Sequence, residues 1–245
     1  MKISVFKTVD ELLAAVADYF IATGKMAILT RGEFNVALSG GTSPVKLYEM
    51  LASREFNEQI EWRKINFFFG DERHVPKKSL ANNASMVEKA LFDPLNISAS
   101  QIFSVDTTLP PDEAAAKYAG IISDHFKAEP VRFDMILLGL GENAHTASLF
   151  PYTAVLGDKS ASVKAVYLEE QNRYRITMTA SLINQARHIA FLVFGEPKRD
   201  AVFHVLESAK DPEKYPAQLI HPVNGDLQWF LDEAAASGLK REALS

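Results

Sequence analysis

Apolar residues along the chain follow two alternating patterns, one typical of helices and one typical of buried strands. Residues 10–24 place apolar side chains such as Leu12 and Val16 three or four positions apart, which is the spacing of an amphipathic helix. Thr8 and Asp10 are both suited to cap the start of this helix, because either side chain can accept a backbone hydrogen bond.

The next segment, residues 34–53, predicts a strand, a glycine turn and a second helix. A short run rich in strand-forming residues ends at Gly40 and Gly41. The helix that follows would have Ser43 as its cap and Pro44 in its first turn, where proline is well tolerated.

This alternation of strand and helix patterns continues to the end of the chain. Buried or short strands are predicted at residues 35–39, 65–70, 133–141, 165–170, 174–179 and 187–195. Helices are predicted at residues 10–24, 43–53, 82–92, 111–126, 196–208 and 226–238. Continuous apolar strands alternating with helices indicate an α/β fold with a largely parallel sheet covered by helices on both faces. No repeat or linker divides the chain, so we expect residues 1–245 to form a single domain, with residues 152–180 as a small β-containing lobe.

Composition and charge narrow the classes of partner. Hydrophobic residues make up 47% of the 245 residues and charged residues 23%, with a net charge of −5. No block of like charge occurs, so we expect no nucleic-acid partner and no membrane surface. The apolar runs at 135–140 and 189–194 are too short to span a bilayer, and the N-terminus lacks the apolar core of a secretory signal. We therefore expect a cytoplasmic protein, a monomer or small homo-oligomer.

Four predicted strands end in polar or glycine-rich loops. Because ligands of open α/β sheets bind outside the carboxyl ends of the strands, we expect these loops to share one site. The first reads SGGTSP, where Gly40, Gly41, Thr42 and Ser43 precede a helix. Free N–H groups at a helix start bind anions such as phosphate. Taken alone, the same residues also fit a tight turn with a hydroxyl cap.

The second loop, GDERHVP, places Arg73 beside two acidic residues directly after a buried strand. Arg73 could serve a phosphate or a developing oxyanion, and a structural ion pair is the simpler interpretation of these charges alone. The fourth loop, GEPKRD, places Lys198 in the first turn of a helix. A cation there opposes the helix dipole, and an anionic ligand would remove the conflict.

The third loop, GLGENAH, fits the weak dinucleotide pattern G-x-G-x-x-A between Gly139 and Ala144. Its position past the middle of the chain, the early Pro151 and the lack of a suitably spaced acidic residue argue against a nucleotide site. His145 remains as a candidate general base, because an imidazole with an ordinary pKa of about 6.5 can accept a proton near neutral pH. A structural histidine is the alternative.

The sequence contains no motif for metal, thiol or serine-esterase chemistry. The chain has no cysteine, its six histidines are scattered, and neither H-E-x-x-H nor G-x-S-x-G occurs. We expect no metal site.

Taken together, the motifs resemble those of the 6-phosphogluconolactonase family. The segments that carry the resemblance are LSGGTSPVKLYEML, GDERHVP, FDMILLGLGENAHTASLFP, RITMTASLINQARHIAFLVFGEPKRDAV and the closing pair PAQLIHP and GDLQWFLDEAAA, in the family's order. The resemblance implies a modified Rossmann-like α/β fold related to that of glucosamine-6-phosphate deaminases. It also implies hydrolysis of 6-phospho-D-glucono-1,5-lactone to 6-phospho-D-gluconate, the second step of the oxidative pentose phosphate pathway, without metal or cofactor.

The resemblance also implies roles for individual residues. Gly40, Gly41, Thr42 and Ser43 would hold the substrate phosphate, with Lys198 and Arg175 supplying charge. His145 would be the general base that activates water. Arg73 would bind substrate or stabilise negative charge, and Asn83 would line the pocket.

Two residues depart from the family pattern of Asp-Gly-His. Asn143 stands where an aspartate would orient the histidine, and it can still accept a hydrogen bond, although the lost charge should lower the pKa of the His145 imidazole. Ala144 replaces glycine, which suggests that the backbone there needs no positive φ. Gln171, Asn172 and Arg173 replace the residues usual before RIT, which puts a substrate contact from this segment in doubt.

Two other functions fit parts of the sequence. A sugar-phosphate deaminase or isomerase would carry DEY where Arg73 stands and a further acidic residue after the histidine, and this chain has neither. A non-catalytic sugar-phosphate sensor would keep the pocket but not the reaction, and Asn143 is the feature that keeps this alternative open.

Overall fold

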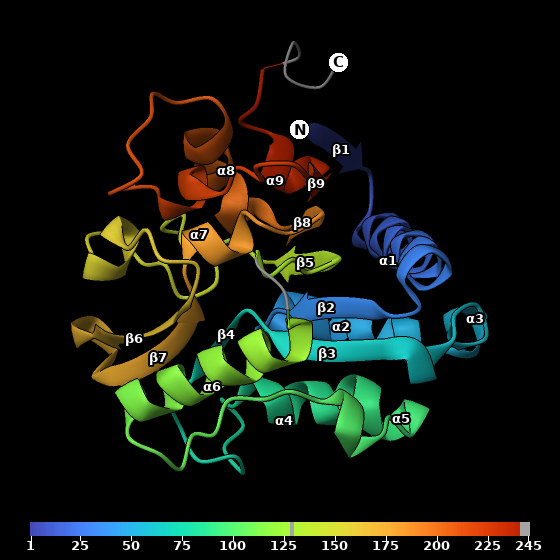
Figure 1. Cartoon of the computed structure of the whole chain (residues 1–245). Coiled ribbons are helices and arrows are strands. Elements are labelled where there is room, and N and C mark those ends of the chain that lie inside the picture. Colours follow the sequence, from blue (N-terminus) through green and yellow to red (C-terminus); the bar gives the residue numbers. More distant parts are fainter. Residues whose placement is uncertain (128–129, 241–245) are drawn as a thin grey trace.

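The computed structural model describes residues 1–127 and 130–240. Its central feature is a six-stranded sheet of strand order β1-β9-β8-β5-β2-β3 in which all neighbours are parallel (Figure 1). The strands are β1 Lys2–Phe6, β2 Phe34–Leu38, β3 Ile65–Phe69, β5 Met135–Leu138, β8 His188–Val193 and β9 Asp226–Asp232. The α/β fold with a largely parallel sheet is therefore confirmed.

Helices cover both faces of this sheet. They are α1 Val9–Arg31, α2 Thr42–Ala52, α3 Arg54–Asn57, α4 Asn83–Val87 continued by a π turn Glu88–Phe92 and by α5 Asp93–Leu95, α6 Pro111–Phe126, α7 Ala180–Ile183, α8 Arg199–Leu206 and α9 Glu233–Ala236. Alternate strand residues point to opposite faces: Val36 and Leu38 pack with α1 and α2, whereas Ala37 packs on the side of α6. Both faces are thus buried, which explains why the strands read as continuous apolar runs.

A second, antiparallel sheet of order β4-β7-β6 lies to one side of the large sheet (Figure 1). It consists of β4 Asp71–Arg73, β6 Val163–Leu168 and β7 Arg173–Met178. The predicted β-containing lobe is confirmed, and it also recruits β4, which follows β3 after one residue. The small sheet therefore joins the end of a central strand directly to the lobe.

The first helix begins at Val9, and of the two predicted caps it is Thr8 that caps it, forming a capping box with Glu11. It continues past the predicted end to Arg31, and its length and mean composition are those of a candidate membrane span. Half of its apolar window is buried within the protein, and Leu12 and Phe20 are fully buried in the core. The helix packs on the sheet as a core element.

The prediction of a helix at residues 226–238 was wrong. Residues 226–232 form β9, and only the last turn, α9, is helical. Trp229 and Phe230 suit a strand as well as a helix, and parallel pairing with β8 and β1 decides between them, because the segment inserts between these two strands. The sequence analysis also missed β1, which completes the sheet beside β9.

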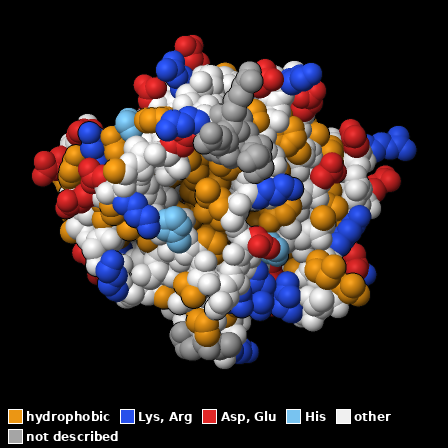
Figure 2. Space-filling view, turned by 90° about the horizontal axis from the view of Figure 1, so that it is seen from above, with side chains coloured by type: hydrophobic (Ala, Val, Ile, Leu, Met, Phe, Trp, Pro, Cys, Tyr) orange, Lys and Arg blue, Asp and Glu red, His pale blue; other side chains and the backbone are white. Residues whose placement is uncertain are grey.

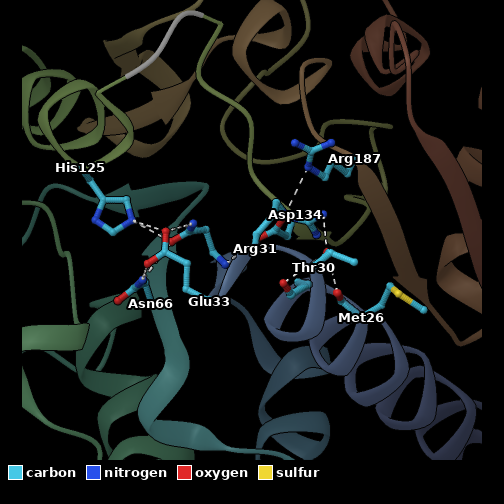
Figure 3. Close-up of polar contacts among 10 residues, drawn as sticks. Met26, Thr30, Arg31, Glu33, Asn66, His125, Asp134 and Arg187 are labelled. Carbon is cyan, nitrogen blue, oxygen red and sulfur yellow. Dashed lines mark hydrogen bonds and ion pairs between the residues drawn. The ribbon is translucent and has the colours of Figure 1, made fainter.

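The amino ends of the strands are tied together by a polar network far from the loops discussed above (Figure 3). The buried carboxylate of Asp134 accepts hydrogen bonds from the Arg31 Nε, at 2.8 Å, and from the Asn35 backbone N–H, at 2.8 Å. Arg187 approaches the same carboxylate at 3.5 Å. Burial raises the pKa of Asp134, and these three partners partly offset the rise.

On the surface, charges of both signs are interspersed over the face seen in Figure 2.

Candidate active site

A cavity of about 270 Å³ lies at the carboxyl ends of β2, β5 and β8, beside the small sheet. It is lined by nearly all the residues that the sequence singled out: Gly40, Gly41, Thr42, Ser43, Arg73, Asn83, His145, Arg175 and Lys198. Asn143 does not line this cavity but contacts His145 from outside it. The four predicted loops thus meet at one place.

The glycine loop after β2 leads directly into α2. The helix begins at Thr42 with Gly41 as its N-cap, and no side chain caps it, so the prediction that Ser43 is the cap was wrong. The physical reason is that Ser43 already lies inside the first turn. Position 40 requires glycine because the backbone there lies close to the Asn83 side chain, and a Cβ atom would come within 1.9 Å of the Asn83 Oδ1. The uncapped N–H groups of this first turn border the cavity.

Two buried acidic residues of β4, Asp71 and Glu72, position Asn83 and the backbone of Arg73. The Asn83 side chain donates to the Asp71 backbone oxygen at 2.9 Å, while its Oδ1 is buried without a protein partner among the described residues. The Glu72 carboxylate accepts three backbone N–H groups, from Arg73, Asn83 and Ala84. Burial nevertheless raises the pKa of Glu72 to about 7. Glu72 therefore fixes the start of α4 to β4.

Lys198 reaches the cavity from a short 3₁₀ turn, Glu196–Lys198, that precedes α8. The position of this turn depends on Asp232, whose carboxylate accepts the Gly195 N–H at 3.0 Å and the Ala235 N–H at 2.8 Å. One buried side chain at the end of β9 thus holds both the Lys198 loop and the start of α9.

Arg175 projects from β7, and only 9% of it is exposed. Its Nη2 donates to the Gln171 Oε1 at 2.5 Å, and its Nε is buried without a protein partner among the described residues. Gln171 itself lines the cavity, whereas Arg173 is exposed. Residues 171–173, for which the sequence put a substrate contact in doubt, therefore reach the cavity through Gln171.

His145 has a defined tautomer. Its Nδ1 lies 2.5 Å from the Asn143 Oδ1, and this oxygen can only accept, so Nδ1 carries the proton. Among the described residues, Nε2 has no hydrogen-bond partner and keeps its lone pair. The neutral imidazole at the cavity wall can therefore accept a proton through Nε2.

Charge and burial both favour this neutral form. Burial, followed by the nearby charges of Lys198, Arg175 and Arg73, lowers the pKa of the His145 imidazole to about 4. Burial and the three cations account for this lowering. The separate effect of the aspartate charge lost at Asn143, which the sequence analysis expected to lower the pKa, stays a prediction.

The expectation that residue 144 needs no positive φ was wrong, because Ala144 has a φ of 60°. The Ala144 carbonyl accepts the Ala217 N–H at 3.0 Å, so a neighbouring segment holds the left-handed conformation in place. Ala147 and Tyr152 also have positive φ, of 48° and 61°. Strained backbone is concentrated in the loop that carries His145.

Several residues that shape the site were missed by the sequence analysis. Ser148 donates to the Asp71 carboxylate at 2.6 Å and so joins the histidine loop to β4. Tyr48 bonds to Ser39 and Tyr118 bonds to Phe69, each holding the backbone where a strand ends. Only their polar character within apolar patterns could have indicated them, since their partners are distant in sequence.

Within residues 1–127 and 130–240, no group of three histidine, aspartate or glutamate side chains is arranged to hold a metal ion. The cations and amide groups of the cavity instead suit an anionic, hydroxyl-rich ligand.

Comparisons with known proteins agree on one family. Its profile, described as glucosamine-6-phosphate isomerases/6-phosphogluconolactonase, matches residues 7–229. The 6-phosphogluconolactonase of Synechocystis sp. is 38% identical over 87% of this chain and 88% of its own length. That of Haemophilus influenzae is 33% identical over 94% of this chain and 96% of its own length.

Solved structures show the same relationship. A 6-phosphogluconolactonase from Trypanosoma brucei superposes with a TM-score of 0.84 at 26% identity, covering 98% of each chain. A monomeric glucosamine-6-phosphate deaminase superposes with a TM-score of 0.84 at 22% identity over 98% of this chain and 100% of that one, which demonstrates the shared fold alone.

Proposed function

The chain belongs to the family of glucosamine-6-phosphate isomerases and 6-phosphogluconolactonases, and we propose that it hydrolyses 6-phospho-D-glucono-1,5-lactone to 6-phospho-D-gluconate. Its relatives at 30–38% identity, over most of both chains, bear the lactonase name. The observation that carries the proposal is a neutral His145, oriented by Asn143, facing a cavity that holds three cations.

The substrate phosphate binds at the start of α2. The uncapped N–H groups of Thr42 and Ser43 and the positive end of the helix dipole favour an anion there. Lys198 and Arg175, which also line the cavity, add positive charge. Anchoring the phosphate on C6 fixes where the sugar ring lies in the cavity and so places the lactone carbonyl carbon near His145.

His145 then acts as the general base. Its Nε2 removes a proton from a water molecule as the water oxygen forms a bond to the lactone carbonyl carbon. The carbonyl oxygen becomes an oxyanion, which Arg73 or backbone N–H groups stabilise. The tetrahedral intermediate collapses, the bond from this carbon to the ring oxygen breaks, and the imidazolium returns its proton to that oxygen.

Asn143 has an orienting role in this scheme. As a neutral acceptor it fixes the tautomer of His145 without stabilising the imidazolium by charge. The three cations further disfavour the imidazolium, so proton return to the leaving oxygen is strongly driven. The substrate phosphate, which carries negative charge into the cavity, partly compensates during proton uptake.

A deaminase or isomerase function is less well supported. The deaminase that superposes on the chain is 22% identical, whereas the lactonases in the comparisons reach 38%. The sensor alternative predicts that 6-phosphogluconate binds but that the lactone is not turned over. A turnover assay separates it from the lactonase.

The decisive experiment follows proton release from freshly generated 6-phosphogluconolactone, against the spontaneous rate. The native chain should accelerate hydrolysis strongly, and His145→Ala should lose about 10²-fold or more in kcat while still binding 6-phosphogluconate. Lys198→Ala should mainly raise KM. Binding without acceleration by the native chain would favour the sensor, and near-normal turnover by His145→Ala would remove the assigned base.

We also propose a cytoplasmic location and no nucleic-acid or membrane partner, with the chain as a monomer or small homo-oligomer. The packing of α1 within the core and the mixed surface charges support this. The predicted single domain, residues 1–245, accords with a family match that spans residues 7–229.

A further inference from the structure

The His145 ring is enclosed more tightly than its hydrogen bond to Asn143 requires. The Phe150 ring stacks on the imidazole, with 3.9 Å between ring centroids and 16° between their planes. Gly141 lies against the Nδ1–Cε1 edge, where a Cβ atom would come within 2.0 Å of Nδ1 and 2.1 Å of Cε1. Three contacts therefore fix the imidazole: Asn143 at Nδ1, Gly141 along one edge and Phe150 on one face.

Phe150 also separates two cavities. It lines the catalytic cavity and, with Gln171, a neighbouring cavity of about 850 Å³ formed by residues 142–144 and 150–155, by β6 and by Tyr215. The neighbouring cavity is open and partly polar, with Glu142, Glu169 and Glu170 at its walls. Without the Phe150 ring, the stacked face of His145 would be exposed to that space and its water.

We propose that Phe150 is a positioning residue for His145, holding the imidazole plane so that Nε2 faces the substrate and shielding the ring from the neighbouring cavity. The inference rests on the proposed function, because it concerns the orientation of the proposed base. A flat ring is needed for this, since a branched aliphatic side chain of similar polarity offers no parallel face. Arg175 lies 6.0 Å from the centroid of the same ring, so Phe150 also limits how that cation approaches.

The proposed role of Phe150 can be followed through the titration of His145. Lys198, Arg175 and Arg73 lower the pKa of the imidazole, Asp71 and Glu142 lie at the walls, and burial is the largest cause of the lowering. Removing the Phe150 ring leaves all these charges in place and relieves burial alone. The titration midpoint of His145 should therefore rise toward the ordinary value of 6.5.

The test compares Phe150→Leu with Phe150→Tyr, which keeps the ring. Phe150→Leu should lower kcat by about 10- to 100-fold with KM changed by less than about twofold, since misplacing a reacting group affects the chemical step. It should also raise the imidazole midpoint of His145, followed by NMR, by about one pH unit or more. Phe150→Tyr should stay near the native values in both readouts.

The matched control is Phe103→Leu, since Phe103 stacks on Phe68, with 4.5 Å between centroids, away from the cavity. It should lower thermal stability without changing kcat or the His145 titration. If Phe150→Leu fails to fold, Phe150→Met replaces it.

Unchanged kcat and an unchanged midpoint in Phe150→Leu would overturn the inference, and so would equal losses in Phe150→Tyr and Phe150→Leu. The NMR titration needs no turnover, so it judges the positioning role even if the native chain proves to be no lactonase.

Discussion

At the scale of single residues, the pH dependence of the reaction follows from the environment of His145. With an imidazole pKa of about 4, the proposed base His145 is almost fully neutral at pH 7. We expect the acid limb of kcat/KM, which reports the free enzyme, to have a midpoint well below 6.5.

Asn143→Asp should move this acid limb to higher pH, because a carboxylate beside Nδ1 stabilises the imidazolium. The pH–rate profiles of the native chain and the variant give the comparison. Asn96→Asp adds the same charge at the end of α5 and should leave the midpoint where it is. Identical profiles for Asn143→Asp and the native chain would contradict the assigned role of Asn143.

Ala144 gives a prediction about stability with an unusual sign. Its φ of 60° is unfavourable for any residue with a Cβ atom, so Ala144→Gly should stabilise the fold by about 0.5–1 kcal/mol. The control Ala17→Gly replaces a buried alanine within α1 and should destabilise it by about 1 kcal/mol. Urea denaturation measures the free energy of unfolding of both variants. A loss of stability in Ala144→Gly would show that packing of the Ala144 methyl group stabilises the fold by more than its left-handed backbone costs.

At the scale of elements, one carboxylate connects a strand to the loop that carries Lys198, a cation proposed to bind the substrate. Asp232→Ala removes the acceptor for both Gly195 and the first turn of α9, and should cost about 1–3 kcal/mol in stability. It should also raise KM, because Lys198 loses its support. Asp226→Ala, at the exposed opposite end of the same strand, should do neither. Calorimetry measures the stability and initial rates measure KM. An unchanged KM in Asp232→Ala would show that the position of Lys198 does not depend on the hydrogen bonds of Asp232.

The elements also show what sequence patterns can and cannot predict. Strands such as β3 and β8 were predicted because an unbroken apolar run between polar loops has few other interpretations. β9 was missed because Trp229 and Phe230 fit the apolar spacing of a helix as well as that of a strand, and only insertion between β1 and β8 settles their conformation. The site loops were predicted from their place after strands, whereas the stacking of Phe150 on His145 and the left-handed backbone at Ala144 depend on packing that no local pattern encodes.

At the scale of the whole molecule, two buried groups make opposite contributions to stability as pH changes. Burial raises the pKa of Glu72 from 4.5 to about 7, so the native state holds a proton that the unfolded chain releases, and stability falls as pH rises through this window. The pKa of His145 falls from 6.5 to about 4, so the unfolded chain holds the extra proton and stability rises over nearly the same window. Each contribution is about 3 kcal/mol at most, and they largely cancel.

The native chain should therefore show a nearly flat stability profile between about pH 4.5 and 6.5 from these two groups. His145→Ala should show stability falling with pH across that range, and Glu72→Gln should show it rising. Chemical denaturation at several pH values measures the slopes. A flat profile in His145→Ala would mean that Glu72 titrates normally in the folded protein, and a flat profile in Glu72→Gln would mean the same for His145.

The cations around the cavity also act after the ester bond has broken. The lactone enters with charge on its phosphate alone, but hydrolysis creates a carboxylate where a neutral ester stood. Arg73, Arg175 and Lys198 line this space, within a chain of net charge −5, and they attract the more highly charged molecule more strongly. The enzyme would thus be inhibited by what it makes, with escape of 6-phosphogluconate slowing turnover at low ionic strength and added salt relieving it.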